Sequence, residues 1–321
     1  MRGVVLAVAI GLLGVAPTAP HRPPPVVAQA SAQARPRSLP LPLHGLTLER
    51  VTPLPATVRA VAAHRAHPTV RLVFQRGTGP AAYARAVRRL RPHASLMGEV
   101  VDSTAVRALS VSAYRKRTRA YVNRFGARID LWEIGNELNG EWLGRPRRIN
   151  AKVLAAYRVV EKEHTGLRSA ITLNYWPSRD CYAKPWEATL RFARRMPGEV
   201  RHGVDYVFLS FYETACEPVA RPSARKVGRT FAALKRIFPR ARVGFGEIGA
   251  QRRSDGLPSN PTLAEKQRVA KRYYGMHQTL RHRLGRRYVG GYFWWYYADD
   301  AVPRHRPRSL WPTLDRLFRS Y

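Results

Sequence analysis

Two glutamates of this chain stand in settings that suit acid–base or nucleophilic chemistry. Glu137 follows Asn136 at the end of a hydrophobic run, and Glu247 ends a glycine-containing run of little other polarity. Cleavage of a glycosidic bond needs one carboxyl group that protonates the leaving oxygen and a second that attacks the sugar or activates water. Burial and a neighbouring negative charge can keep one carboxyl group of such a pair protonated. The pair can do this chemistry only if the fold brings both residues to one pocket.

Short segments rich in β-branched and aromatic residues recur along the chain, and a helical stretch follows most of them. The eight expected strands are Leu46–Thr52, Thr69–Gln75, Ala94–Ser103, Ile129–Glu137, Ala170–Trp176, Asp205–Glu213, Arg242–Gly249 and Tyr288–Tyr297. The expected helices are Ala81–Arg91, Ala151–Glu163, Pro185–Arg195, Ser223–Phe238, Thr262–Leu284 and Leu310–Tyr321. Alternation of this kind predicts a single-domain (β/α)8 TIM barrel of the α/β class. An open doubly wound sheet is disfavoured, because no glycine-rich phosphate loop follows the first strand.

The barrel supplies the missing geometry. Catalytic groups of a TIM barrel lie at the C-terminal ends of its strands. Glu137 ends the fourth expected strand and Glu247 ends the seventh, so the two would face each other across the barrel mouth. Two carboxyl groups placed there could lie about 5–5.5 Å apart, which is the separation that a retaining double displacement uses.

The segment Trp132–Asn139, with the sequence WEIGNELN, resembles the W-E-x-x-N-E-x-N signature of clan A glycoside hydrolases. The resemblance implies that Glu137 is the acid/base and that Asn136 binds the sugar 2-hydroxyl. It also implies that Glu247 is the nucleophile and that Tyr212, at the end of the sixth strand, contacts it.

The same resemblance implies that a tryptophan at the end of the eighth strand, Trp295 or Trp294, forms the floor of the sugar site. Across most of its length the chain also resembles a set of uncharacterised secreted bacterial barrel proteins. The shared patterns lie at Gly135–Gly144 and Gly291–Tyr296. This second resemblance supports the fold and says little about the substrate.

Further candidates for substrate binding come from the other strands. Arg71 on the second strand either lies near the nucleophile, as in clan A, or forms a plain interior ion pair with Glu133. Trp176, at the end of the fifth strand, could stack on a sugar ring or could pack in the core. Only one of Trp294 and Trp295 can face the pocket, because neighbouring residues of a strand alternate in direction.

Other acids near the strand ends have weaker claims. Glu99 and Asp102 could line the pocket or be exposed, whereas Glu141, Asp299 and Asp300 are interpreted as loop residues that bind no substrate. The mechanism requires no metal ion and no organic cofactor, and we predict none.

The N-terminal segment predicts export. A positive start and the apolar run Gly3–Val15 precede two A-x-A patterns, which is typical of a cleaved signal peptide, although an uncleaved anchor would have a similar start. We expect residues 1–34 to hold the signal peptide and the start of a linker. Residues 35–44 would form a Pro-rich linker and residues 45–321 the catalytic domain. The mature chain would be secreted, with no membrane span.

The two cysteines and the net charge bear on the surroundings of the protein. Cys181 and Cys216 fall in neighbouring loops of the expected barrel, and an oxidising space would allow them to form a disulfide. The formal net charge of +35, mostly from arginine, could attract an anionic polysaccharide or another polyanion, or could reflect composition alone. No nucleic-acid-binding motif is present. The alternative to a glycoside hydrolase is therefore a non-catalytic barrel that binds carbohydrate or polyanions.

Overall fold

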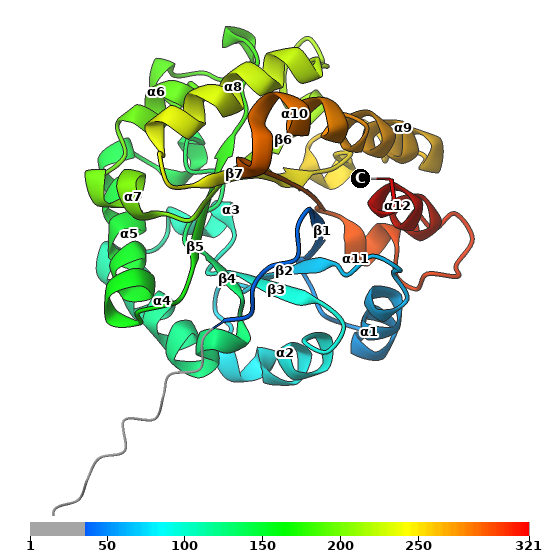
Figure 1. The fold of residues 1–321 in the computed structure, drawn as a ribbon, viewed down its shortest axis with the longest axis horizontal. Coiled ribbons are helices and arrows are strands. Elements are labelled where there is room, and N and C mark those ends of the chain that lie inside the picture. Colours follow the sequence, from blue (N-terminus) through cyan, green and yellow to red (C-terminus); the bar gives the residue numbers. More distant parts are fainter. Residues whose placement is uncertain (1–35, 321) are drawn as a thin grey trace, which may run out of the picture. The chain divides into compact units, whose positions relative to one another are not determined.

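Eight parallel strands close into a barrel in chain order, with β1 paired to β8 (Figure 1). The strands are β1 Leu43–Leu48, β2 Thr69–Val73, β3 Ser95–Glu99, β4 Leu131–Glu133, β5 Ser169–Asn174, β6 Tyr206–Phe211, β7 Arg242–Ile248 and β8 Tyr288–Trp294. The computed structural model describes residues 36–320, so the predicted signal peptide lies outside the described residues. The predicted single-domain TIM barrel is confirmed.

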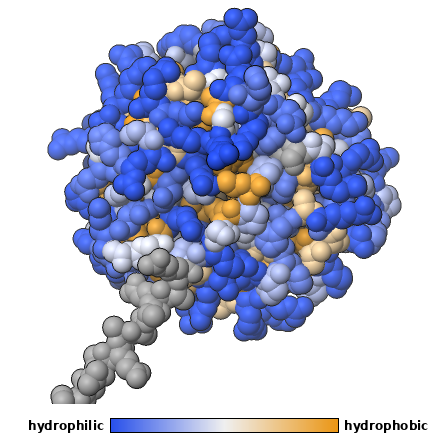
Figure 2. Space-filling view, viewed as in Figure 1, coloured by the Kyte–Doolittle hydropathy of each residue, from blue (hydrophilic) through white to orange (hydrophobic). Residues whose placement is uncertain are grey.

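Helices surround the barrel on its outside (Figure 1). They are α1 Leu54–Ala62, α2 Ala84–Leu90, α3 Ser103–Val106, α4 Val111–Phe125, α5 Pro146–Arg158, α6 Thr189–Arg194, α7 Gly198–Gly203, α8 Ala224–Ile237, α9 Leu263–Tyr274, α10 His277–Leu284, α11 Tyr297–Asp300 and α12 Trp311–Phe318. Hydrophilic residues cover most of the face drawn in Figure 2, and apolar residues show mainly near its centre.

Helix α4 shows how the sequence builds one of these elements. The side chain of Ser110 accepts a hydrogen bond from the backbone N–H of Ala113, which caps the first turn. Tyr114, Tyr121 and Phe125 fall on one buried face, and Gly126 ends the helix with a φ of 47°. A glycine accepts this left-handed conformation without steric cost. The helix therefore presents an aromatic stripe to the strands and an arginine-rich face to water.

The barrel has two apolar layers, because parallel strands bury both of their faces. The larger layer lies between the strands and the helices. The smaller cluster is formed by Leu39, Leu43, Met97, Leu131, Ala170, Tyr206, Phe208, Val289 and Phe293. Leu39 precedes β1, so the segment expected to be a linker takes part in the packing.

Most element boundaries differ from the predicted ones by a few residues, and some differences are larger. β1 begins at Leu43, three residues before the predicted start, and so takes in the end of the predicted linker. β4 ends at Glu133, four residues before Glu137, because the chain turns after it. The predicted helix Thr262–Leu284 is two helices that break at Gly275. Helices α1, α3, α4, α7 and α11 were not among the expected ranges, and α3, α7 and α11 are each no longer than six residues.

Candidate active site

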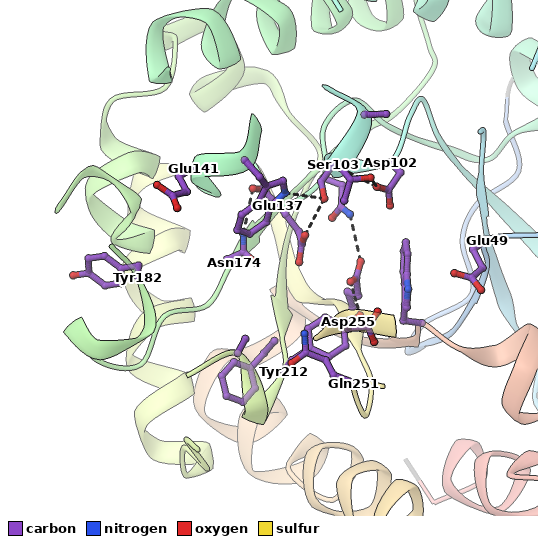
Figure 3. Close-up of a pocket in the computed structure, with 18 of the residues that line it drawn as sticks. Glu49, Asp102, Ser103, Glu137, Glu141, Asn174, Tyr182, Tyr212, Gln251 and Asp255 are labelled. Carbon is purple, nitrogen blue, oxygen red and sulfur yellow. Dashed lines mark hydrogen bonds between the residues drawn. The ribbon is translucent and has the colours of Figure 1, made fainter. Parts of the chain in front are cut away.

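A cavity of about 840 Å³ opens at the C-terminal ends of the strands. Both Glu137 and Glu247 line it, together with Asn136, Tyr212 and Trp295. The labelled side chains surround the cavity in Figure 3, with Glu141 and Tyr182 at one side and Glu49 at the other. The fold thus brings the two predicted catalytic carboxyl groups to one pocket.

Glu137 reaches this pocket through an unusual backbone conformation. Its φ is 51°, in the left-handed region that residues other than glycine rarely adopt. The backbone around it is fixed by hydrogen bonds: the N–H of Leu138 donates to the carbonyl of Thr172, and the side-chain amide of Asn174 donates to the carbonyl of Glu137. Strained residues of this kind occur where the surrounding structure holds them, often at functional sites.

Two serine hydroxyls hold the carboxyl group of Glu137. The hydroxyl of Ser210 on β6 donates to Oε1 at 2.8 Å. The hydroxyl of Ser103 donates to Oε2 at 3.0 Å (Figure 3). Ser103 in turn accepts the indole N–H of Trp142 at 3.2 Å. Burial, followed by the negative charge of Glu247, raises the pKa of Glu137 to about 8, against the opposing effect of the two serines. Glu137 therefore carries a proton at neutral pH, as a general acid must.

Glu247 has the opposite environment, because a cation lies against it. Its Oε2 accepts a hydrogen bond from Nη1 of Arg71 at 2.7 Å, and its Oε1 accepts the hydroxyl of Tyr212 at 2.6 Å. The side-chain amide of Asn136 lies 3.4 Å from Oε2. Burial raises the pKa of Glu247 above its usual value, although Arg71 and the hydroxyl of Tyr212 oppose this rise. These contacts stabilise the carboxylate form and fix its direction.

Arg71 lies beneath the cavity and serves three carboxyl groups at once. Its Nε donates to Glu133 at 2.6 Å, Nη1 donates to Glu247, and Nη2 lies 3.0 Å from Glu99. The side chain of Arg71 is fully buried. Burial raises the pKa values of Glu99 and Glu133. Arg71 opposes this rise, but one cation does not offset the burial of three acids. Both alternatives considered for Arg71 therefore hold: it pairs with Glu133, and it contacts Glu247.

Solved structures of glycoside hydrolases share this fold. The GH53 catalytic domain of Ignisphaera aggregans matches with a TM-score of 0.56 and 12% identity over 89% of this chain and 98% of its own. The GH10 xylanase of Thermobacillus composti matches with a TM-score of 0.56 and 13% identity, over 85% of this chain and 95% of its own. A β-glucosidase of Thermotoga maritima matches with a TM-score of 0.51 and 12% identity, over 76% of each chain. The expected likeness in fold to clan A glycoside hydrolases is thus found.

Comparison by sequence adds nothing to this. No protein-family model matches the chain, and no curated protein does. At 12–13% identity the structural matches show the fold alone.

The structure separates the predicted binding residues into two groups. Asn136, Tyr212, Trp176 and Trp295 line the cavity. Trp294 does not, which corrects its inclusion among them: it is fully buried and its indole N–H donates to Asp300 at 2.9 Å. Alternation along the strand end explains why Trp295 takes the pocket side.

Arg71 is also absent from the cavity lining and contacts Glu247 from outside it. Among the other acids, Asp102 lines the cavity and caps α3, while Glu99 is buried against Arg71. Glu141 lines the cavity as well, although it was interpreted as a residue that binds no substrate.

Several residues of the site carried no signal in the sequence. Ser103, Ser210 and Asn174 hold Glu137, yet single serines and asparagines are common at strand ends and follow no spacing rule. The sequence likewise gives no indication of the positive φ of Glu137. One signal could have been used: Ser210 stands two residues before Tyr212, on the same side of β6.

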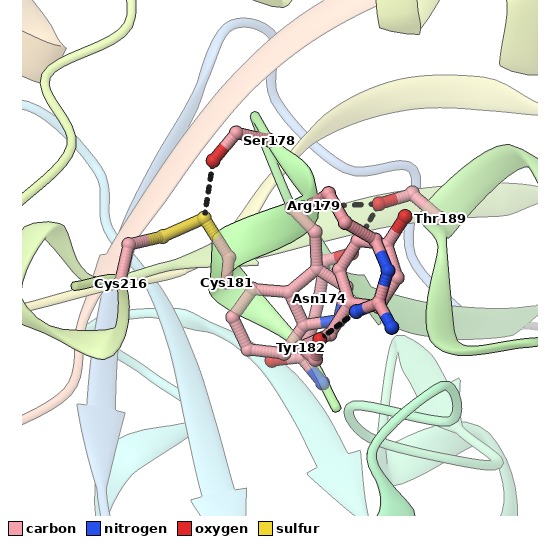
Figure 4. The surroundings of a disulfide bond; sticks show 8 residues. Asn174, Ser178, Arg179, Cys181, Tyr182, Thr189 and Cys216 are labelled. Atoms are coloured by element: carbon pink, nitrogen blue, oxygen red, sulfur yellow. Dashed lines mark hydrogen bonds between the residues drawn. A yellow bond between two sulfur atoms is a disulfide. The ribbon is translucent and has the colours of Figure 1, made fainter. Parts of the chain in front are cut away.

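A disulfide joins the loops that follow β5 and β6 and form one wall of the cavity (Figure 4). Cys181 and Cys216 are the bonded pair, with Cα atoms 4.2 Å apart, as predicted from their loops. The guanidinium of Arg179 lies 4.8 Å from the ring centre of Tyr182 on the same loop. The bridge therefore fixes the wall that carries Trp176 and Tyr182.

Within residues 36–320, no three side chains of histidine, cysteine, aspartate or glutamate come together in a way that could hold a metal ion. Nor does any helix in this range have the length and apolar character needed to cross a membrane.

Proposed function

We propose that this protein is a retaining glycoside hydrolase in which Glu247 is the nucleophile and Glu137 is the acid/base. The observation that carries the proposal is the different environment of the two carboxyl groups in one cavity. Glu137 has a pKa of about 8 and holds its proton, whereas Glu247 is paired with Arg71 and Tyr212. Double displacement requires such a pair: one protonated acid and one carboxylate.

In this mechanism Oε1 or Oε2 of Glu247 attacks the anomeric carbon, and the glycosidic bond breaks as Glu137 gives its proton to the leaving oxygen. The glycosyl–enzyme ester is then cleaved by water, whose proton passes to Glu137, and Glu247 is released as a carboxylate. Tyr212 and Arg71 each contact one of the two oxygens of Glu247, and we expect these contacts to persist during both steps of the reaction.

The cavity wall offers groups that suit sugar hydroxyls. Oδ1 of Asn136 accepts no hydrogen bond within residues 36–320, and the indole N–H of Trp176 donates none there. Buried polar atoms are normally satisfied, so a ligand that both donates and accepts fits these two. Trp295 is half-buried at the cavity and presents a face on which a sugar ring can stack.

The charge of the cavity points to a substrate without acidic groups. Among residues 36–320, seven acidic side chains line it and Arg76 is the single lysine or arginine that does so. The acids are Glu49, Asp102, Glu137, Glu141, Glu187, Glu247 and Asp255. Glu137 holds a proton, and Glu141 and Glu247 are paired with Lys184 and Arg71. The other acids of the lining would still meet a polysaccharide of uronic acids or sulfated sugars with like charge, at a cost that opposes binding. We therefore propose a neutral glycan in place of the anionic one that the net charge allowed.

Export is part of the proposal. The N-terminal pattern of the sequence predicts a signal peptide, and the Cys181–Cys216 disulfide fits an oxidising space outside the cytoplasm. Mass analysis of the chain recovered from the medium of an expressing bacterium would locate the mature N-terminus. Retention of the full-length chain in the cells would contradict export.

Covalent trapping tests the mechanism. The purified protein is incubated with a panel of activated 2-fluoro sugars, and its intact mass is compared with that of Glu247→Gln. We expect an adduct on the wild type and none on Glu247→Gln. Glu137→Gln serves as the matched control, because an activated leaving group needs no acid and the adduct should still form. A folded protein that binds neutral oligosaccharides in calorimetry, but forms no adduct with any sugar of the panel, would be a non-catalytic carbohydrate-binding barrel.

A further inference from the structure

A second cavity, of about 510 Å³, lies at the end of the barrel opposite the proposed active site. It is lined by residues that precede β1, β3 and β4, where the strands begin and not where they end. We call it the arginine cavity, because its lining includes Arg37, Arg88, Arg91, Arg124 and Arg128. Ala84, Val87, Pro92 and Phe125 complete the lining, so no acidic residue takes part in it.

An acidic residue beside the cavity, Asp130, already has a cationic partner. Asp130 is fully buried, and Arg37 binds it through Nε at 3.2 Å and through Nη2 at 2.8 Å. Arg37 also donates to the carbonyls of Arg91 and Ala94. The charges of this pair therefore cancel, and Arg37 serves as a structural part of the cavity wall.

The other four arginines of the cavity have no such partner. Within residues 36–320, none of Arg88, Arg91, Arg124 and Arg128 lies within ion-pair distance of a carboxylate. Arg91 uses Nη2 on the carbonyl of Ala127 at 3.3 Å, and its buried Nε donates to no atom of the described chain. A buried N–H without an acceptor costs free energy that a bound anion or water would recover.

This pattern is not common to all clustered arginines of the chain. Arg115 and Arg119 share Glu163, and Arg252 binds both Asp299 and Asp300. In the arginine cavity, four arginines instead line a half-open space without a carboxylate partner from the described residues, and three of them, Arg88, Arg124 and Arg128, are exposed to solvent. Arginine side chains form paired hydrogen bonds with phosphate oxygens, and several together favour a multiply charged anion.

We propose that the arginine cavity binds a flexible polymer through its phosphate groups. Its volume falls within the range of roughly 300–1,000 Å³ for small-molecule pockets. A short stretch of a thin chain fits such a space, whereas a nucleic-acid duplex would need an extended surface. The site is independent of the proposed glycosidase reaction, because the two cavities share no residue.

The test compares two triple variants that remove the same charge. Arg88→Gln/Arg124→Gln/Arg128→Gln alters the cavity. Arg225→Gln/Arg229→Gln/Arg236→Gln alters exposed arginines of α8 that have no ion pair in the described chain. The probe is short linear inorganic polyphosphate, and Kd is measured by calorimetry in a salt series that includes about 0.15 M.

We expect the cavity variant to bind polyphosphate at least tenfold more weakly than the wild type, and the α8 variant to remain within threefold. Loss of three phosphate contacts should also make the slope of log Kd against log salt shallower by about 2. Glu137→Gln should bind like the wild type. Equal weakening of both triple variants would overturn the proposal, because it would show attraction by bulk charge alone. Binding of heparin, polyglutamate or duplex DNA as tight as that of polyphosphate would overturn the assignment to a flexible phosphate chain.

Discussion

The contacts of Arg71 lead to a prediction with a calculable size. In Arg71→Met, the buried acids Glu99, Glu133 and Glu247 lose the cation that lies 2.6–3.0 Å from each of them. Removing one member of a buried ion pair costs about 3–5 kcal/mol, because the remaining charge stays buried without compensation. The free energy of unfolding should therefore fall by about this amount at pH 8.

The sign of the pH dependence follows from linkage. Without Arg71, burial raises the pKa of at least one of these acids far above its unfolded value, so the folded variant holds a proton that the unfolded chain releases. The contribution of such a group to stability is fully present below the unfolded pKa and is lost as pH rises. Relative to the wild type, the variant should lose about 1.4 kcal/mol per pH unit for each proton that its folded state holds in addition to those of the wild type, or about 4 kcal/mol between pH 5 and pH 8 for one such proton.

Urea unfolding of both proteins at several pH values between 5 and 8 measures this difference. Arg115→Met is the matched control, because Arg115 pairs with Glu163 at an exposed site. We expect it to cost less than about 1 kcal/mol, with no added pH slope. Arg71→Lys keeps a charge and should recover part of the loss. If the free energy of unfolding of Arg71→Met stays within about 1 kcal/mol of that of the wild type at every pH, Arg71 does not stabilise the three buried acids.

The remaining predictions concern the two carboxyl groups and the disulfide. Activity should fall as pH rises through about 8, because Glu137 loses its proton, and Ser210→Ala should move this fall to higher pH in a pH–rate profile. An unchanged profile would remove Ser210 from the control of that proton. Tyr212→Phe should lower kcat/KM by about 10- to 100-fold, since it removes a 2.6 Å hydrogen bond to the nucleophile, and should shift the acidic limb upward. The double variant Cys181→Ser/Cys216→Ser should lower the free energy of unfolding by about 2–4 kcal/mol, because the bridge closes a loop with a sequence separation of 35. Urea titration of the variant beside the oxidised and the reduced wild type checks this, and a midpoint equal to that of the oxidised wild type would contradict it.

The barrel could be predicted because its signals are local and repeated. Each strand of an all-parallel barrel is a short apolar run, and the rule that chemistry lies at the C-terminal strand ends reduces 21 acidic residues to a few candidates. The resemblance to clan A glycoside hydrolases then singled out Glu137 and Glu247 among them. The disulfide could be expected because Cys181 and Cys216 come after neighbouring strands and the N-terminal pattern predicted export to an oxidising space. Trp294 was selected wrongly alongside Trp295, since the pattern did not show which neighbour faces inward.

The parts that could not be predicted depend on side chains from distant loops. Ser103 meets Glu137 only because α3 begins beside the turn after β4, and no spacing in the chain encodes this. The same holds for the acidity of the cavity. Glu49, Asp102 and Asp255 come from three different loops, and each looks like an ordinary polar loop residue by itself.

The distribution of charge distinguishes an anionic substrate from an anionic partner bound elsewhere, which the net charge of +35 alone does not. A charge of that size suggested that the substrate itself could be anionic. The described residues place acids around the cavity with the proposed catalytic pair, and place a cluster of arginines without acidic partners at the other end of the barrel. Since charges farther apart than about 10 Å are largely screened at physiological salt, each end acts on its own ligand. An anionic partner and a neutral substrate are therefore compatible in one molecule, and neither would compete with the other for its site.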